Sequence, residues 1–155
     1  MITAIVAMDD KHGNATSEGI PWDIPKDRHY FKTKTLNNTV VMGYKTYLSI
    51  GTPLSKRSNI VLTSHSNIKK GFKPARSINE VLLDAGDNFF VIGGQDIYKA
   101  FLPHTQKILI TRIDGNFACN RFFPEFKSKF KLYYKSKQFQ ENDYIFRYEH
   151  WQRGD

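Results

Sequence analysis

Asp27 and Phe31 form the first group of residues whose types and spacing suit a chemical role. They lie four residues apart in a segment that begins at Pro25, so in a helix they share one face. On that face an aromatic ring can stack on a flat heterocycle while the carboxylate accepts its N–H groups. The spacing fits equally a first-turn acid favoured by the helix dipole, beside a core phenylalanine. From the spacing alone, this structural interpretation is preferred.

Three further segments combine strand ends with glycines or hydroxyls: 91–97, 41–47 and 62–65. In the first two, an apolar strand runs into glycine and then into a helix start, where bare amides can bind an anion. Many such turns use glycine for geometry alone, and small hydroxyls often cap turns. The third glycine of the dinucleotide-binding fingerprint is missing, which disfavours a standard Rossmann domain. Together the three segments predict a cofactor with more than one phosphate.

The histidines and the cysteine form no recognisable metal or nucleophile motif. The five histidines lack ligand spacing, and no metal site is predicted. The single cysteine, Cys119, excludes a disulfide framework and a zinc site built from several cysteines. Neither a nucleophile elbow nor a P-loop is present.

Alternating strands and helices must position these groups. Strands are expected over 2–7, 39–42, 58–63, 88–92 and 107–113, helices over 25–35, 44–49, 77–85 and 95–102, a polar loop over 9–19, and two long C-terminal strands over 129–139 and 143–151. Ser77 and Glu80 form a capping box at the third helix. The pattern predicts an α/β domain with a mostly parallel sheet and an antiparallel edge, and ligands at the carboxyl ends of its strands.

Length and charge narrow the functional classes. The chain has 155 residues, enough for one domain, expected to span 1–155, and a net charge of +8 that favours anionic partners. Lysines alternate with Phe130, Leu132 and Tyr134 over 127–137, which predicts a strand with one wet face. A solvated edge explains this stretch better than a nucleic-acid platform. No apolar run could span a membrane and no leader is recognised, so a cytoplasmic protein is expected.

Several short motifs, in their order and spacing, resemble dihydrofolate reductases of the bacterial and phage type over essentially the whole chain. The motifs are Pro21-Trp22, Pro25-Lys26-Asp27, Phe31-Lys32, Val41-Met42-Gly43 with Thr46, Ser49-Ile50-Gly51 with Pro53-Leu54, Arg57 with Asn59-Ile60, Val91-Ile92-Gly93-Gly94 with Ile97-Tyr98, Thr111-Arg112-Ile113-Asp114, and Phe122-Phe123-Pro124. The resemblance implies a single domain with a central, mostly parallel eight-stranded sheet, an antiparallel C-terminal strand and about four helices. It also implies NADPH-dependent reduction of 7,8-dihydrofolate to tetrahydrofolate.

The resemblance assigns a substrate side. Asp27 is implied to hold the pterin and support protonation at N5, Thr111 to be linked to that carboxylate, and Trp22 to organise nearby water. Arg57 is implied to grip the glutamate α-carboxylate, a task that suits a guanidinium fork. The implied substrate-binding residues are Ile5, Asp27, Phe31, Lys32, Ile50, Leu54, Arg57, Ile92, Tyr98 and Thr111.

The resemblance also assigns a cofactor side for NADPH. The implied residues are Ala7, Gly13, Ile20, Gly43, Lys45, Thr46, Leu62, Thr63, Ser64, His65, Arg76, Gly93, Gly94, Gln95, Asp96 and Ile97. Thr63, Ser64 and His65 would surround the 2′-phosphate with Arg76 nearby. Family members carry a cis peptide bond at the Gly93-Gly94 position.

Three positions depart from the family pattern. Ala15 replaces a loop glycine, Tyr44 an arginine at the cofactor turn, and Cys119-Asn120 a Gly-Asp pair that helps latch the active-site loop. These departures concern loop closure and cofactor affinity rather than the reaction.

The sequence leaves three other functions open. They are a reductase of the same fold acting on another heterocycle such as a riboflavin-pathway pyrimidine, a basic nucleic-acid-binding module, and a cofactor-binding protein without turnover. The expected partners are dihydrofolate, with or without further glutamates, and antifolates such as methotrexate or trimethoprim. A monomer that binds neither nucleic acid nor membrane is expected.

Overall fold

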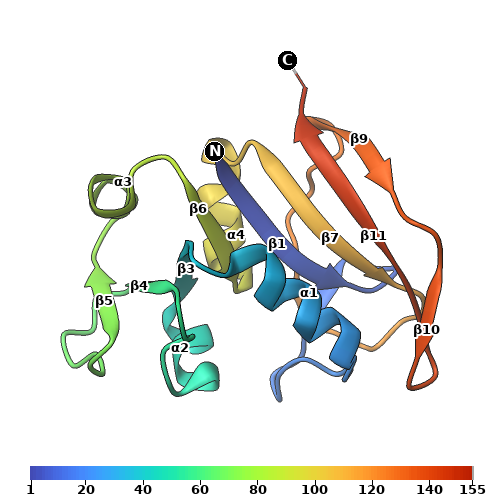
Figure 1. The fold of residues 1–155 in the computed structure, drawn as a ribbon, viewed down its shortest axis with the longest axis horizontal. Coiled ribbons are helices and arrows are strands. Elements are labelled where there is room, and N and C mark those ends of the chain that lie inside the picture. Colours follow the sequence, from blue (N-terminus) through green and yellow to red (C-terminus); the bar gives the residue numbers. More distant parts are fainter. Residues whose placement is uncertain (155) are drawn as a thin grey trace.

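A mixed sheet forms the centre of the computed structural model, which describes residues 1–154 (Figure 1). Its strands are β1 (Ile2–Met8), β3 (Thr39–Gly43), β4 (Ser58–Leu62), β5 (Phe72–Ala75), β6 (Phe89–Gly93), β7 (Lys107–Ile113), β9 (Phe130–Lys135), β10 (Phe139–Glu141) and β11 (Tyr144–Arg153). They lie in the order β10-β11-β7-β1-β6-β3-β4-β5, and β9 pairs with β11. β9 and β10 follow one another along the outer side of β11, so the sheet is eight strand positions wide.

The six strands from β7 to β5 are parallel, and β11 is antiparallel to β7. The predicted fold class, a mostly parallel sheet with an antiparallel C-terminal strand, is confirmed. A separate two-stranded ribbon joins β2 (Gly13–Ala15) to β8 (Arg121–Phe122). β2 lies inside the segment expected to be a polar loop.

Four α-helices accompany the strands in the described chain: α1 (Pro25–Thr35), α2 (Tyr44–Ile50), α3 (Ile78–Ala85) and α4 (Gln95–Phe101), the last followed by a 3₁₀ turn, η1 (Leu102–His104). α1 starts at Pro25, whose missing N–H costs nothing in the first turn. Ser77 Oγ accepts from Glu80 N at 3.1 Å and caps α3, as predicted. The Glu80 side chain instead accepts from Arg76 N at 3.0 Å, one residue before the expected partner.

Burial on both faces explains the apolar runs of the central strands. Val40, Val41 and Met42 in β3 are all fully buried, and consecutive residues belong to different core clusters. Figure 1 shows α1 in front of the sheet and α4 behind it, so helices cover both faces. Phe101 of α4 and Val81 of α3 lie in the same cluster as Val41.

The C-terminal strands differ from the prediction of one strand over 129–139, which is wrong. β9 ends at Lys135, where Ser136 N donates to Tyr148 O and Ser136 Oγ accepts from Tyr148 N, both at 2.8 Å. The chain bends there before β10 begins. The expected one wet face is also wrong beyond Phe130, because Leu132 and Tyr134 are about half exposed (45% and 49%).

β5 was not predicted, because Lys73 and Pro74 interrupt its apolar pattern and only Phe72 and Ala75 are buried.

Among residues 1–154, no helix combines the length and apolarity that a membrane crossing requires.

Candidate active site

The carboxyl ends of the parallel strands gather the predicted cofactor residues. β6 lies between β1 and β3, although the chain forms it after β5, so the strand order reverses beside β1. Ligands of open α/β sheets bind at such a switch point, outside the carboxyl ends of the strands. Ala7, Gly43, Leu62 and Gly93 each stand at or next to the end of one of these strands.

Asp27 in the first turn of α1 is connected to Thr111 in β7. Thr111 Oγ1 donates to Asp27 Oδ1 at 2.6 Å across 84 residues of sequence, as the resemblance implied. Burial raises the pKa of the Asp27 carboxyl above its usual value, and the Thr111 hydrogen bond partly opposes that rise. Thr111 is the side-chain donor to this carboxylate among the described residues, which leaves Asp27 capacity to accept N–H groups from a ligand.

The apolar residues predicted for the substrate side lie on α1 and on one core cluster. Phe31, half-buried, follows Asp27 by four residues on the same face of α1. Ile50, Leu54 and Ile92 pack against the buried cluster of Val40, Met42, Tyr47, Val61 and Phe72. The structure therefore places three of the apolar residues predicted for the substrate side on one core cluster.

Arg57 is held in a fixed orientation beside the end of α1. Its Nη1 donates to Thr35 Oγ1 at 3.1 Å and its Nε to Ser55 O at 3.0 Å. Partial burial lowers the pKa of its guanidinium. Asn59, which is buried, fixes the loop before it by bonding the backbone of Leu54 and the carbonyl of Arg57, each at 3.0 Å. Lys32 is exposed on α1.

Tyr98 lies beneath the strand ends rather than at their surface. Its side chain is buried, and its hydroxyl donates to the carbonyl of Ile5 at 2.7 Å. Burial raises the pKa of this hydroxyl, which therefore stays a donor. Tyr98 thus fixes the carbonyl of Ile5, which is itself buried in β1.

The glycine turns of β3 and β6 meet each other. A Cβ at Gly43 would lie 2.6 Å from Ile97 Cγ1, so only glycine allows α4 to approach the end of β3 this closely. A Cβ at Gly94 would lie 3.9 Å from Thr46 Oγ1, so the starts of α2 and α4 face one another. The Gly93-Gly94 peptide bond is cis, as the resemblance implied.

A second polar group follows β4. Thr63 is buried and its Oγ1 accepts from His65 N at 3.0 Å, while Arg76 Nη1 donates to Ser64 O at 3.4 Å. The His65 ring stacks on Tyr44 with 3.8 Å between centroids. Tyr44, one of the departures from the family pattern, thus closes this corner with an aromatic face. Lys45 is exposed beside it.

Other predicted cofactor residues lie away from this group. Gln95 Oε1 accepts from Phe122 N at 2.6 Å, so its side chain faces β8. Gly13 is buried against Cys119, while Ile20 is largely exposed and Asp96 is exposed in the first turn of α4.

Sequence reasoning missed two residues next to this site. Asp9, after β1, is completely buried and bonded to backbone N–H groups. Phe117 contacts Trp22 edge-on, with ring centroids 5.4 Å apart. Asp9 stands four residues before a glycine, which is a turn signal, but nothing local marks Phe117.

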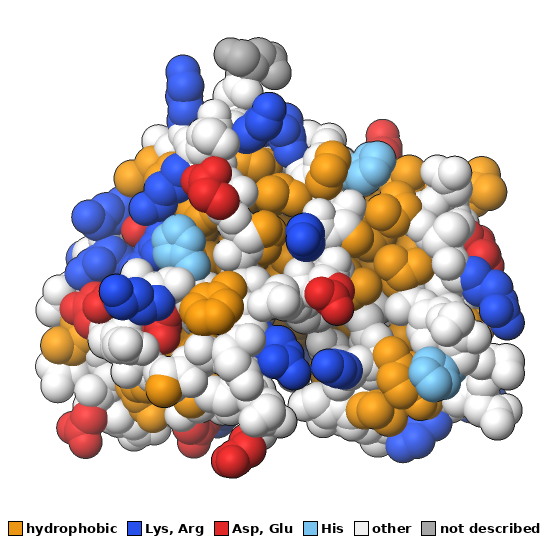
Figure 2. Space-filling view, turned by 180° about the vertical axis from the view of Figure 1, so that it is seen from behind, with side chains coloured by type: hydrophobic (Ala, Val, Ile, Leu, Met, Phe, Trp, Pro, Cys, Tyr) orange, Lys and Arg blue, Asp and Glu red, His pale blue; other side chains and the backbone are white. Residues whose placement is uncertain are grey.

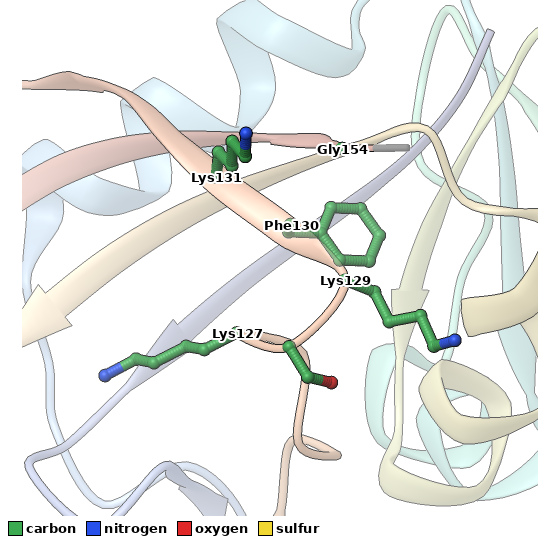
Figure 3. A pocket seen from close by; sticks show the side chains of 6 residues that line it. Lys127, Lys129, Phe130, Lys131 and Gly154 are labelled. Carbon is green, nitrogen blue, oxygen red and sulfur yellow. The ribbon is translucent and has the colours of Figure 1, made fainter.

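Two hollows lie far from these residues, around Phe130. Their volumes are about 150 and 460 Å³, and Ser128, Lys129 and Phe130 line both. Figure 2 shows Lys and Arg side chains gathered on this side of the molecule. In Figure 3, however, the side chains of Lys127, Lys129 and Lys131 point in different directions, so they do not converge on one anion. The solvated-edge interpretation fits this surface better than a binding site.

Comparison with known proteins gives a consistent result. The dihydrofolate reductase family model matches residues 1–153. The dihydrofolate reductase of Bacillus subtilis is 38% identical over 136 residues, covering 85% of this chain and 81% of that protein. That of Staphylococcus haemolyticus is 37% identical over 126 residues, covering 79% and 76%.

A solved structure extends the likeness to the fold. The structure of dihydrofolate reductase from Enterococcus faecalis, complexed with NADP(H) and RAB-propyl, superposes with a TM-score of 0.91 and 31% identity over 100% of this chain and 97% of that one. Because the match spans sequence, family model and three-dimensional arrangement, the chain belongs to the dihydrofolate reductase family.

Proposed function

We propose that this enzyme reduces 7,8-dihydrofolate with NADPH at the site formed by the first turn of α1 and the carboxyl ends of the parallel strands. The observation that carries the assignment is the Asp27–Thr111 pair. It presents a half-buried carboxylate with free acceptor capacity beside apolar side chains. A pterin offers a 2-amino group and a ring N–H to such a carboxylate, and a flat face to Phe31. Family membership makes dihydrofolate the substrate.

The chain's own residues bind and orient the substrate. Asp27 accepts the pterin N–H groups and favours protonation at N5, while Thr111 holds the carboxylate in place. NADPH, when bound, supplies the hydride that reaches pterin C6. Water beside Trp22 delivers the N5 proton, since no side chain of the site is assigned to that atom.

The glutamate end fits the Arg57 corner. Two guanidinium nitrogens are already used by Thr35 and Ser55, which fixes the plane of the fork. The remaining N–H donors suit a carboxylate. Ile50, Leu54 and Phe31 line the path between this fork and Asp27, the place for an aminobenzoyl group.

The cofactor fits the paired glycine turns. The close approach at Gly43, and the space at Gly94 that a side chain would fill, leave backbone amides accessible for a pyrophosphate, with Lys45 and Thr46 adjacent. Thr63, Ser64, His65 and Arg76 supply donors for a 2′-phosphate. Gln95 and Tyr98 act indirectly. Gln95 accepts from Phe122 N, and Tyr98 donates to the carbonyl of Ile5.

The test is to follow NADPH absorbance with purified protein and dihydrofolate, with and without methotrexate. Methotrexate-sensitive loss of NADPH supports both the reaction and the pterin site. If both ligands bind tightly but NADPH is not consumed, the proposal of a working site fails. If neither methotrexate nor NADPH binds, the assigned binding site is wrong.

We further infer that residues 1–155 act as one domain, and that the enzyme is a cytoplasmic monomer that binds antifolates such as methotrexate or trimethoprim. Light scattering, cell fractionation and inhibitor titration test these expectations separately.

A further inference from the structure

Asp9 is a completely buried carboxylate that the proposed reaction does not use. It follows β1, and its Oδ1 accepts from Lys11 N at 2.9 Å and from Gly13 N at 2.8 Å. Its Oδ2 accepts from Phe117 N at 3.0 Å, 108 residues away. One carboxylate thus joins the turn after β1 to the loop after β7.

Close packing surrounds this carboxylate. A Cβ at Gly13 would lie 2.4 Å from Cys119 Cβ and 3.1 Å from Asp9 Oδ1, so Gly13 admits no side chain. Burial, with Asp9 as a neighbour, raises the pKa of the Cys119 thiol to about 11. The thiol therefore stays neutral and acts as packing against the loop.

Backbone bonds extend the same junction. Asp10 N donates to Gly115 O at 3.0 Å, and Asn120 N donates to Ala15 O at 3.1 Å. Ala15 and Cys119-Asn120 are positions where the sequence departs from the family pattern. Here the junction uses the Asn120 backbone, and its side-chain acceptors are Asp9 and Asp10, whose Oδ2 accepts from Gly115 N at 2.9 Å.

The Asp9 bond leads directly to the substrate side. Phe117, whose N–H Asp9 holds, places its ring edge-on to Trp22 at 5.4 Å and 74°. Trp22 is buried, and it shares a core cluster with Ile24 at the start of α1. Trp22 is also the residue proposed to organise water at the pterin.

We propose that Asp9 is a positioning residue for the reductase reaction, which acts through Phe117 to hold Trp22 in its place beside the substrate. The inference rests on the proposed function, because Trp22 matters only if the pterin binds there. It requires no contact between Asp9 and either ligand. Small displacements of positioning groups are enough to slow an enzyme strongly.

The substitution Asp9→Asn selectively removes the bond from Phe117 N to the residue 9 side chain. Its amide oxygen can keep the two bonds to Lys11 N and Gly13 N, while its NH₂ group faces Phe117 N–H, donor against donor. The local turn is kept and only the long-range bond is lost. Phe117→Leu makes the complementary change, since it removes the ring and keeps the bond from Phe117 N.

The experiment measures single-turnover hydride transfer and NADPH affinity for the wild type, both single variants and the double variant. We expect each single variant to slow hydride transfer ~10-fold, with NADPH affinity changed less than about twofold. The double variant should be no slower than the slower single variant, because both changes cut one path. Asp10→Asn is the matched control, since Asp10 is exposed and accepts one bond, from Gly115 N, at the same junction.

A second readout reports on Trp22 itself. In a Trp151→Phe background, Trp22 is the one remaining tryptophan, and its emission should shift in Asp9→Asn and Phe117→Leu but not in Asp10→Asn. Multiplying rate losses in the double variant, or an unchanged emission, would overturn the proposal. If Asp9→Asn does not fold, an unchanged hydride rate in Phe117→Leu also overturns it. Activity of the wild type tests the proposed function separately, so the two failures are distinguishable.

Discussion

Two carboxylates in this enzyme, one half-buried and one completely buried, show opposite uses of the same functional group. Asp27 has one side-chain donor, the Thr111 hydroxyl, and burial raises its pKa. Asp9 has three backbone donors and no exposure to solvent. Both connect segments far apart in the sequence, yet only the first keeps acceptor capacity for a ligand.

The difference shows how the number of donors separates binding from positioning. A carboxylate whose oxygens accept from several backbone N–H groups is held in one place by those bonds. Burying a carboxylate that has one donor costs free energy in the ligand-free enzyme. A ligand that supplies N–H groups stabilises such a carboxylate. The proposed site follows the second description and the loop junction follows the first.

The largest expected effect is the loss of turnover when the ligand-facing carboxylate is neutralised. Asp27→Asn should reduce the rate of dihydrofolate reduction at neutral pH by ~10²–10³-fold, the usual contribution of a positioned acid or base. NADPH affinity should remain nearly that of the wild type, because Asp27 lies on the substrate side. Steady-state kinetics and NADPH titration measure both, and full activity in the variant would contradict the assigned role.

The next largest effect is expected on the free energy of unfolding when Asp9 is substituted. Asp9→Ala leaves three N–H groups without their acceptor, two of them partly buried, and should lower the free energy of unfolding by about 3 kcal/mol. Urea denaturation measures the loss. Asp10→Ala, at an exposed carboxylate with one bond, should cost less than about 1 kcal/mol. Equal losses in the two variants would remove the distinction between them.

The two sites also differ in how well the sequence predicts them. The pattern of α1 indicates Asp27 and Phe31 on one face, and the family resemblance supplies Thr111 as the partner. The Asp9 link uses backbone N–H groups, which every residue except proline carries, so no residue type signals it. Long-range bonds of this kind become visible only when the loops are placed in space.

The same contrast holds for the fold. β3 and β6 are predicted because burial on both faces gives them continuous apolar runs. β5 and the break between β9 and β10 are not, because their limits depend on neighbouring strands rather than on their own residues. β9 is an edge strand whose lysines keep it solvated, so its alternation gives no reliable inner face.

A smaller effect is expected when the Thr111 hydroxyl, which donates to the Asp27 carboxylate, is removed. Thr111→Val removes the hydrogen bond that opposes the burial-driven rise, so the pKa of Asp27 should increase further. Titration of the Asp27 carboxyl by carbon-13 NMR measures the shift. Thr111→Ser keeps the donor and should titrate like the wild type. A fall in the pKa with Val would show that another group dominates this carboxylate.

The smallest expected effect concerns how much the charged Asp27 carboxylate lowers the stability of the ligand-free enzyme. Its pKa is higher in the folded than in the unfolded chain, so between the two values the folded state binds more protons. Stability therefore falls as pH rises from the unfolded-state pKa of ~3.9 through the folded-state value. Asp27→Asn lacks this loss, and near neutral pH it should unfold at a slightly higher temperature than the wild type, by about 2–4 °C for a gain of ~1 kcal/mol.

The pH dependence of this gain identifies its origin. It should shrink toward zero as the pH falls below the unfolded-state pKa, where the wild-type carboxyl is protonated in both states. Thermal melts of both ligand-free proteins across this range measure the difference. The corresponding Asp9→Asn protein should be less stable than the wild type throughout the neutral range, because its carboxylate is satisfied by three N–H donors. A stabilising Asp9→Asn, or a destabilising Asp27→Asn, would mean that the number of protein donors does not distinguish a ligand-binding carboxylate from a positioning one.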